Sequence, residues 1–365
     1  MDSRVVYRID LAQLKKNISF IQSCAGDCKL MPILKYDAYG MGALEVGSAL
    51  KEAGAFRFGA ANCEEALQLK RLGLDVQILG VLFPWEIAPA AAANIICPVC
   101  SAAIAKEISR EAVKQGRKVR IAIKLDTGMG RLGLQPAGAV DEIAEICRLP
   151  NLQPDSLFSH FASAAQPDRS FSGLQIERFL SAKSALDARG IFFPFYHHAA
   201  GDAAVKLPQA VSAPFNLIRP GGMMYGDDFT GGCRQIVELT TFVGDIRELP
   251  AGASVGYYRT YIAGKKIRAA ILAAGYADGI PLALSNQGRV VIRGQYCPVL
   301  GRVSMDYTVV DISDLPEVSI GDEAVLLGRR GDNAVSVREW SRIKNTHSHD
   351  IWCAIGHRAK REYIR

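Results

Sequence analysis

Basic side chains that could bind an anion or move protons follow directly after several short apolar runs of the sequence. Carboxylates are scarce among them, which disfavours glycoside hydrolysis by paired acids and an all-carboxylate magnesium site. The set suits an anionic ligand, such as a phosphorylated cofactor together with a substrate carboxylate. Its members are Lys35, Lys124, Asp126, Arg131, His160, His197, His198 and Arg219.

Lys35 follows the run Leu30–Leu34 and is the candidate nucleophile. A lysine in an apolar setting at the end of a strand can lose its proton and condense with an aldehyde. From position alone, a surface salt bridge is the alternative. The segment Lys35–Gly42 also places glycines beside an expected helix start, where backbone N–H groups could approach a phosphate.

Two other glycine-rich segments could bind phosphate. The segment Arg219–Gly222 follows a strand-like run, so its amides could hold a phosphate or simply form a turn. The segment Gly128–Gly133 fits the pattern G-x-G-x-x-G. Pro136 and the preceding Asp126 indicate a tight loop there instead of a helix start, which disfavours a nicotinamide enzyme.

Cysteines and histidines give weaker signals. The nine cysteines are odd in number and accompany no secretion signal, so we expect reduced thiols. Cys97 and Cys100 have redox-motif spacing but lie in an expected strand, where no helix N-terminus lowers a thiol pKa. Four residues near the C-terminus have zinc-like spacing, but interleaved apolar residues favour a core segment and we expect no metal. They are His347, His349, Cys353 and His357.

The elements that position these residues alternate between strands and helices. Asp10 can cap a helix whose apolar residues recur at steps of three and four. Eight apolar runs separated by helix-like stretches predict a closed (β/α)8 TIM-like barrel, whose chemistry belongs at the carboxyl ends of its strands. The runs are Leu30–Leu34, Phe56–Ala60, Val76–Leu79, Ile95–Val99, Val119–Leu125, Ser156–His160, Phe192–His197 and Phe215–Ile218.

After about Met224 the pattern changes to short β-rich runs divided by glycine turns, which predicts a C-terminal all-β domain. We expect residues 1–9 to form a strand that packs with this domain. Residues 10–233 should form the barrel and residues 234–365 the β-rich domain. A chain of 365 residues exceeds what one compact core usually holds.

Composition excludes several classes of protein. The net charge of +6, from 43 basic and 37 acidic residues, is mild and scattered, so we expect no nucleic-acid partner. No apolar run approaches the length of a membrane span, and the N-terminus lacks the apolar core of a signal peptide. We therefore expect a cytoplasmic protein without membrane association.

Several segments together resemble the alanine racemase family, whose members are pyridoxal-phosphate enzymes with a barrel and a β domain. Lys35–Gly40 is similar to the family's cofactor-lysine motif, and Lys124–Gly133 matches a second signature. The resemblance covers nearly the whole chain and keeps the family's order. Further matching segments are Ser159–Ala162, Arg219–Gly221, Tyr225–Gly226, Val255–Tyr257, Gly275–Gly279 and Gly301–Asp306.

The resemblance implies a racemase that interconverts L-alanine and D-alanine by a two-base proton transfer at Cα. Lys35 would bind pyridoxal 5'-phosphate covalently through its aldehyde and act as one base. Tyr257, lent by the partner subunit of a homodimer, would be the second base on the opposite face. Arg219 would donate to the pyridine nitrogen, which would limit charge delocalisation and side reactions.

The resemblance also implies a wider set of contacts. Arg131 would touch both cofactor and substrate, steadied by Lys124, which many family members carry as a carbamate. The implied cofactor-binding residues are Lys35, Tyr39, Arg131, His160, Asp202, Arg219, Gly221, Gly222 and Tyr225. The implied contacts to the amino-acid substrate are Arg131, Met305, Tyr276 and His357.

Departures from the family pattern define the alternatives. Gly201-Asp202 stands where the family usually has Asn-Ser, so a hydroxyl that contacts phosphate is lost. His357 stands where a tyrosine commonly narrows the pocket, which makes a serine or broad-specificity racemase the alternative. A non-catalytic pyridoxal-phosphate-binding protein is the alternative of another class, although such proteins lack the β domain that carries Tyr257 and Met305 here.

Overall fold

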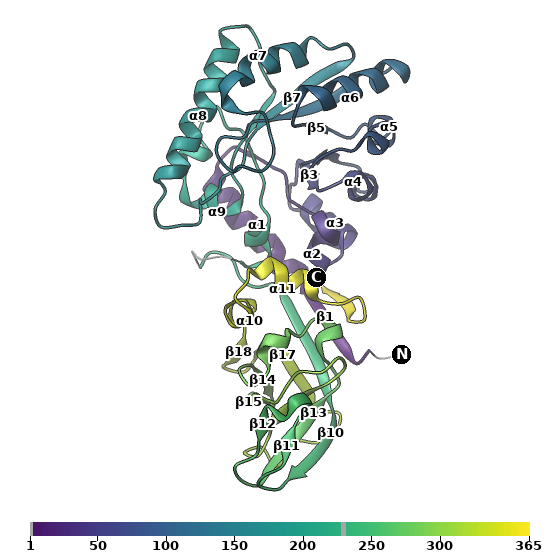
Figure 1. Cartoon of the computed structure of the whole chain (residues 1–365), viewed down its shortest axis with the longest axis vertical. Coiled ribbons are helices and arrows are strands. Elements are labelled where there is room, and N and C mark those ends of the chain that lie inside the picture. The colour runs from purple at the N-terminus through teal and green to yellow at the C-terminus, as the bar shows by residue number, and fades with distance from the viewer. Residues whose placement is uncertain (1–2, 228–230) are drawn as a thin grey trace.

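The computed structural model describes residues 3–227 and 231–365. The molecule is elongated, with a ring of strands and helices at one end and a β-rich domain at the other (Figure 1). At the junction between the two, β1 (Val5–Asp10) leads into α1 (Leu11–Ala25). No helix in either described range combines the length and the apolar character needed to span a bilayer.

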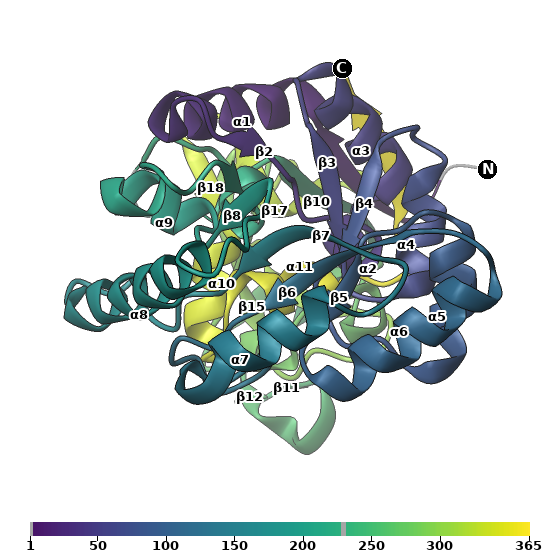
Figure 2. The ribbon, with the colours of Figure 1, turned by 90° about the horizontal axis from the view of Figure 1, so that it is seen from above.

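Eight parallel strands form a closed barrel, which confirms the predicted fold. Strand β9 pairs with β2 to close the ring, and isolated bridges join β2 to β3, β4 to β5 and β8 to β9. Each of the eight predicted runs overlaps one observed strand. Figure 2 shows the ring of strands from above, with helices around it. The strands are β2 (Lys29–Leu30), β3 (Arg57–Ala60), β4 (Asp75–Ile78), β5 (Cys97–Val99), β6 (Val119–Lys124), β7 (Leu152–Phe158), β8 (Phe195–His197) and β9 (Leu217–Ile218).

Helices cover the outside of this ring because each is apolar on one face. In α1 the side chain of Asp10 accepts a hydrogen bond from the Gln13 amide at 2.7 Å, and Leu14, Ile18 and Ile21 are buried. The other barrel helices are α2 (Lys35–Gly40), α3 (Ala43–Glu52), α4 (Cys63–Lys70), α5 (Pro84–Ala92), α6 (Ala102–Lys114), α7 (Pro136–Cys147), α8 (Ser170–Asp187) and α9 (Gly201–Lys206).

The C-terminal domain is a second, smaller barrel of mostly antiparallel strands. Strand β10 pairs with both β13 and β17, and this closes the path β10-β13-β16-β15-β14-β17 into a ring. Strand β1 adds to β10, and β19 adds to β1. The strands are β10 (Val237–Leu249), β11 (Ser254–Val255), β12 (Tyr261–Ile262), β13 (Ile267–Leu272), β14 (Arg289–Ile292), β15 (Gln295–Leu300), β16 (Thr308–Asp311), β17 (Glu323–Arg330), β18 (Asn333–Val335) and β19 (Lys360–Ile364).

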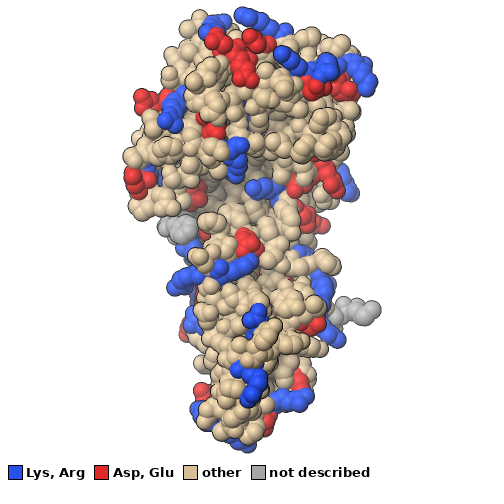
Figure 3. Space-filling model, in the orientation of Figure 1, with Lys and Arg blue, Asp and Glu red and all other residues tan. Residues whose placement is uncertain are grey.

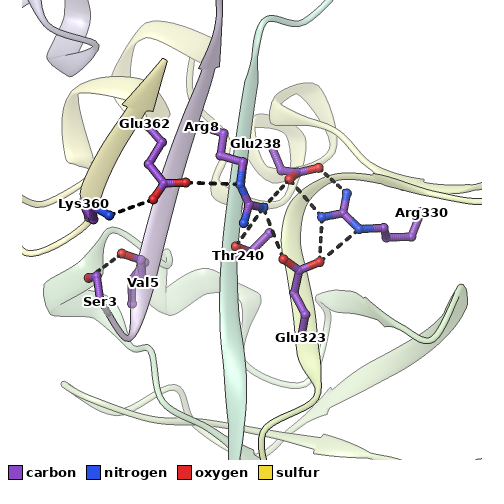
Figure 4. A network of polar contacts seen from close by, with 9 residues as sticks. All are labelled: Ser3, Val5, Arg8, Glu238, Thr240, Glu323, Arg330, Lys360 and Glu362. Carbon is purple, nitrogen blue, oxygen red and sulfur yellow. Dashed lines mark hydrogen bonds and ion pairs between the residues drawn. The ribbon is translucent and has the colours of Figure 1, made fainter. Parts of the chain in front are cut away.

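An ion-pair network ties the N-terminal strand to this domain (Figure 4). Arg8 on β1 contacts Glu238 at 2.8 Å, Glu323 at 3.2 Å and Glu362 at 3.6 Å. Arg330 pairs with both Glu238 and Glu323. The network thus links β1, β10, β17 and β19, the strands that meet near the barrel.

Two helices in the C-terminal part were not predicted from the sequence, α10 (Val337–Lys344) and α11 (Ser348–Ala354). The hydroxyl of Ser336 caps α10 by accepting from the Glu339 amide at 3.1 Å. Trp340 and Trp352 are almost fully buried. In Figure 1 the two helices lie between the β strands and the barrel, so they are placed to reach the carboxyl ends of the barrel strands.

Arg57 on β3 forms a buried ion pair with Asp155 inside the barrel, and its Nη1 lies 2.7 Å from Oδ2. We expect Arg57→Ala to lower the free energy of unfolding by about 3–5 kcal/mol, because it leaves a buried carboxylate without its partner. Urea denaturation followed by circular dichroism measures this loss. Arg247→Ala, which removes an exposed pair with Asp245, should leave the urea midpoint unchanged. Equal midpoints for the two variants would contradict the argument.

Candidate active site

A cavity of about 510 Å³ opens at the carboxyl ends of the barrel strands. Figure 3 shows a hollow on this face of the molecule where the barrel meets the β domain, with basic side chains beside it. A larger cavity of about 700 Å³ lies in the β domain, but none of the predicted site residues lines it. The predicted residues that line the barrel cavity are Lys35, Tyr39, Lys124, Arg131, His160, Asp202, Arg219, Gly221 and Gly222.

The segment that carries Lys35 is a left-handed turn. Tyr36, Asp37, Ala38 and Tyr39 have φ values of 51°, 50°, 54° and 57°. Each such residue costs roughly 1–2 kcal/mol because Cβ approaches the following carbonyl oxygen. The turn buries Tyr39 while Lys35 lines the cavity, and the expected helix follows it as α3.

Contacts from two distant elements, α4 and β19, and from the adjacent α3 hold this strained turn. The amide of Tyr36 donates to Glu65 of α4 at 2.7 Å, and the amide of Ala43 donates to Asp37 at 2.7 Å. Arg361 on β19 donates from Nε and Nη2 to the carbonyl of Gly40 at 3.1 and 3.0 Å. Strain at a site persists only where the surroundings enforce it, so we infer that the position of Lys35 depends on this support.

Gly221 and Gly222 lie against polar side chains. A Cβ added at Gly221 would lie 3.3 Å from the Tyr39 hydroxyl, and one at Gly222 would lie 2.5 Å from Nε2 of His349. Only glycine allows this close approach. Burial raises the pKa of Tyr39, so its hydroxyl keeps the proton and can donate to an anion. The two amides and the phenol could form a cradle for a phosphate, and the imidazole lies beside them.

Arg219 is the most constrained cation of the site. It is buried, and Nη2 donates to the carbonyls of Ser159 at 2.6 Å and His198 at 2.8 Å. No acceptor among the described residues is recorded for Nε. Burial lowers the pKa of Arg219 to about 9, which still leaves the guanidinium protonated at neutral pH. Nε is therefore free to donate to a ligand in the cavity.

Two histidines contact this guanidinium. Nη1 of Arg219 contacts Nδ1 of His197, and Nη2 contacts Nδ1 of His160 at 3.3 Å. Because arginine can only donate, Nδ1 of His197 must act as an acceptor, whereas the longer contact to His160 shares an Nη2 group whose two hydrogens already serve the carbonyls. Burial, reinforced by Arg219 and Arg131, lowers the pKa of His160 to about 3. His160 is thus a neutral support of Arg219.

Lys124 lies at the end of β6, is buried, and lines the cavity near Arg131. Burial is the main cause that lowers the pKa of Lys124 to about 8. Cys100 opposes this shift, whereas Arg219 and Arg131 add to it. An amine with this pKa is partly uncharged at neutral pH, so it can act as a nucleophile.

The glycine-rich segment after β6 does not bind phosphate. The carboxylate of Asp126 accepts hydrogen bonds from the four amides of residues 128–131 at 2.8–3.1 Å. Burial would raise the pKa of Asp126, but these amides outweigh it and lower the pKa. Helix α7 starts only at Pro136. The segment therefore orients Arg131, and a dinucleotide fingerprint is ruled out.

Two predicted contacts differ from the structure. Tyr225 does not line the cavity, because it is fully buried, its hydroxyl donates to the Ile33 carbonyl at 3.1 Å, and its ring packs edge-on against Tyr39. His357 also lies outside the cavity lining and is exposed after α11. His349, which the sequence analysis gave no ligand role, lines the cavity instead.

Tyr257, Tyr276 and Met305 lie in the β domain, outside the cavity of their own chain. Their exposed fractions are 67%, 46% and 52%. The backbone places the last two together, because the amide of Tyr276 donates to Ser304 and that of Ala277 donates to Met305. These side chains therefore face outward from the chain that carries them.

The cysteine motif with redox-like spacing lies in the core of the barrel. Cys97 is buried in β5, and burial raises the pKa of its thiol to about 12. No redox-active environment surrounds it. Within residues 3–227 and 231–365, no three histidine, cysteine or acidic side chains are grouped as metal ligands.

Comparison with known proteins gives full-length matches. The family model "Alanine racemase, N-terminal domain" matches residues 9–228, and "Alanine racemase, C-terminal domain" matches residues 236–363. The alanine racemase of Halothermothrix orenii is 34% identical over 364 residues, covering 97% of this chain and 95% of the relative. That of Geobacter sulfurreducens is 34% identical over 379 residues, covering 100% and 98%.

Solved structures agree with the relatives. The alanine racemase of Streptomyces coelicolor A3(2) superposes with a TM-score of 0.92 at 30% identity, covering 99% of this chain and 98% of that one. The alanine racemase of Bartonella henselae, solved with covalently bound pyridoxal phosphate, superposes with a TM-score of 0.90 at 26% identity and covers 100% of both chains.

Proposed function

This chain belongs to the alanine racemase family, and we propose on that basis that it interconverts L-alanine and D-alanine with pyridoxal phosphate. The observation that carries the proposal is that Lys35, Arg219 and the Gly221–Gly222 cradle all line the same cavity. An amine, a ring-nitrogen donor and a phosphate cradle are what this cofactor needs.

The residues present fit the cofactor. Lys35 would hold it, Tyr39 and the amides of Gly221 and Gly222 would bind its phosphate, and Nε of Arg219 would donate to its ring nitrogen. When bound, pyridoxal phosphate acidifies the Cα–H bond of an attached amino acid. Because Arg219 keeps its proton at neutral pH, it would leave the ring nitrogen of a bound cofactor without a proton of its own.

We further propose that the active form is a homodimer, with each cavity completed by the partner. Inversion at Cα requires one base on each face, and Lys35 is the only such group we assign within this chain. Tyr257, Tyr276 and Met305 are exposed and turned away from their own cavity, as residues lent to a partner would be. In this arrangement Lys35 moves a proton on one face and the partner's Tyr257 on the other. A cytoplasmic location fits a protein that keeps its cysteines reduced.

A chiral assay over a panel of L-amino acids with added pyridoxal phosphate tests the proposed reaction. We expect D-alanine to form from L-alanine. The alternative of a serine racemase rested on His357, which lies outside the cavity. Equal rates with L-serine and L-alanine would favour the broad-specificity enzyme. A yellow protein that racemises none of the panel would favour the non-catalytic binder.

Lys124 should carry a carbamate when bicarbonate is present. Its partly uncharged amine can add to carbon dioxide, and the carbamate would be stabilised by the neighbouring Arg131. We expect a new carbonyl signal in the ¹³C NMR spectrum after incubation with ¹³C-bicarbonate. Lys124→Arg, which keeps the charge but cannot react, should lack this signal. The same signal in both proteins would place the modification elsewhere.

A further inference from the structure

The imidazole of His349 occupies the phosphate end of the cavity and has no role in the mechanism above. Helix α11 places its ring 5.2 Å from the ring of Tyr39, measured between centroids. Its Nε2 lies so close to Gly222 that an added Cβ there would be 2.5 Å away. His349 therefore faces the two glycines that we assign to the phosphate.

A carboxylate lies on the side of this ring that faces away from the glycines. Nδ1 of His349 lies 4.0 Å from Oδ2 of Asp227. The other oxygen of Asp227 accepts from the Ser348 hydroxyl at 2.9 Å, and Arg338 lies 3.9 Å away. With Nδ1 facing the carboxylate, Nε2 is the nitrogen that faces the cavity.

Two acidic side chains lie at this end of the cavity, in addition to the basic residues already described. Two carboxylates, Asp202 and Asp227, line the same cavity and would repel a phosphate. Asp202 pairs with Lys206 at 3.7 Å, and Asp227 has Arg338 and His349 beside it. A protonated His349 would both balance the negative charge of Asp227 and attract the phosphate.

We propose that His349 takes up a proton when the phosphate of the cofactor binds and donates a charge-assisted hydrogen bond to it from Nε2. The proposal rests on the proposed function, because it assumes pyridoxal phosphate as the ligand. His349 would then be a phosphate contact whose strength depends on pH. It would add a hydrogen bond to a site in which Gly201-Asp202 provides no hydroxyl.

The sign of the pH dependence follows from the groups that face His349. Burial lowers its pKa in the free protein, with Asp227 opposing this and Lys35 and His347 adding to it. The free imidazole is thus neutral, and a bound phosphate dianion raises its pKa. The complex therefore holds one more proton than the free protein. The contribution of His349 to cofactor affinity is therefore largest at low pH and falls as the pH rises.

Titration of the apo-protein with pyridoxal phosphate and with pyridoxal, from pH 6 to pH 8.5, tests this coupling. We expect His349→Gln to weaken pyridoxal phosphate binding by roughly tenfold to hundredfold at pH 6, since a charge-assisted hydrogen bond is lost. The difference should shrink as the pH rises. Pyridoxal, which has no phosphate, should bind both proteins equally. His347→Gln, on the exposed neighbour outside the cavity, should keep the pH-dependent affinity, moved slightly to higher pH because a group that opposes protonation of His349 is lost.

Two further measurements keep the inference testable if His349→Gln folds poorly. Calorimetry in buffers of different ionisation enthalpy should detect proton uptake on binding by the wild type. Asp227→Asn removes the carboxylate that favours the imidazolium, so the fall in affinity should move to lower pH. A wild type that takes up no proton, or a His349→Gln profile that matches it at every pH, would overturn the role of His349. If the apo-protein binds no pyridoxal phosphate at Lys35, the proposed function itself fails.

Discussion

Lys35→Ala should abolish racemisation, with a fall of about 10⁴-fold or more, because the same side chain binds the cofactor and serves as a base. The wild type should be yellow and the variant colourless after dialysis. Borohydride reduction followed by peptide mass spectrometry should find the cofactor tag on residue 35. Lys51→Ala, which removes an exposed lysine on the following helix α3, should remain yellow and active.

The position of the tag distinguishes two amines of the same cavity. Lys124 also lines the cavity, and its pKa of about 8 means that it too could react with an aldehyde. Geometry favours Lys35, since it stands next to Tyr39 and the Gly221–Gly222 cradle, with its Nζ 5.8 Å from the centre of the Tyr39 ring. A tag on Lys124 would refute the assignment of both lysines.

Tyr257→Phe should slow racemisation in both directions by about 10²–10⁴-fold, because inversion needs a base on each face. Lys35 stays intact in this variant. One enantiomer should therefore still exchange its Cα hydrogen with deuterated water without inverting, which proton NMR detects. Tyr258→Phe provides the matched control, since the neighbouring phenol is exposed at 84% and has no assigned role.

Co-expression of Lys35→Ala and Tyr257→Phe chains with different tags tests whether the phenol comes from the partner. A mixed dimer contains one cavity with both substitutions and one with neither. Random pairing should then restore about a quarter of the wild-type sites, although each variant alone is inactive. If the tyrosine acted in its own chain, every cavity of the mixture would lack one base and no activity would return.

The sequence was sufficient for residues whose place follows from the barrel itself. Lys35, Lys124, Arg131, His160 and Arg219 come after the ends of parallel strands, which all meet at one end of the ring. The sequence analysis could therefore bring them together without knowing any side-chain geometry. It could also reject the G-x-G-x-x-G reading, because Asp126 precedes the loop whose amides its carboxylate binds.

Features that depend on packing between distant segments could not be predicted from the sequence. His349 enters the cavity because α11 packs on α2, and a seven-residue helix gives too short a pattern for its apolar face to be recognised. One signal was available: His349 lies three residues before Trp352, so on a helix the imidazole would share a face with the buried indole. The left-handed turn at Tyr36–Tyr39 was equally hidden, since none of those four residues is a glycine.

The two hydrogen bonds from Arg361 to the Gly40 carbonyl have a consequence for how the protein is made. This arginine is four residues from the end of the chain, yet it stabilises the loop that presents the cofactor lysine near the beginning. A nascent polypeptide still attached to the ribosome cannot complete that loop until its last strand has emerged. The segment that presents Lys35 therefore gains its final contacts late in synthesis, after the whole β domain has been made.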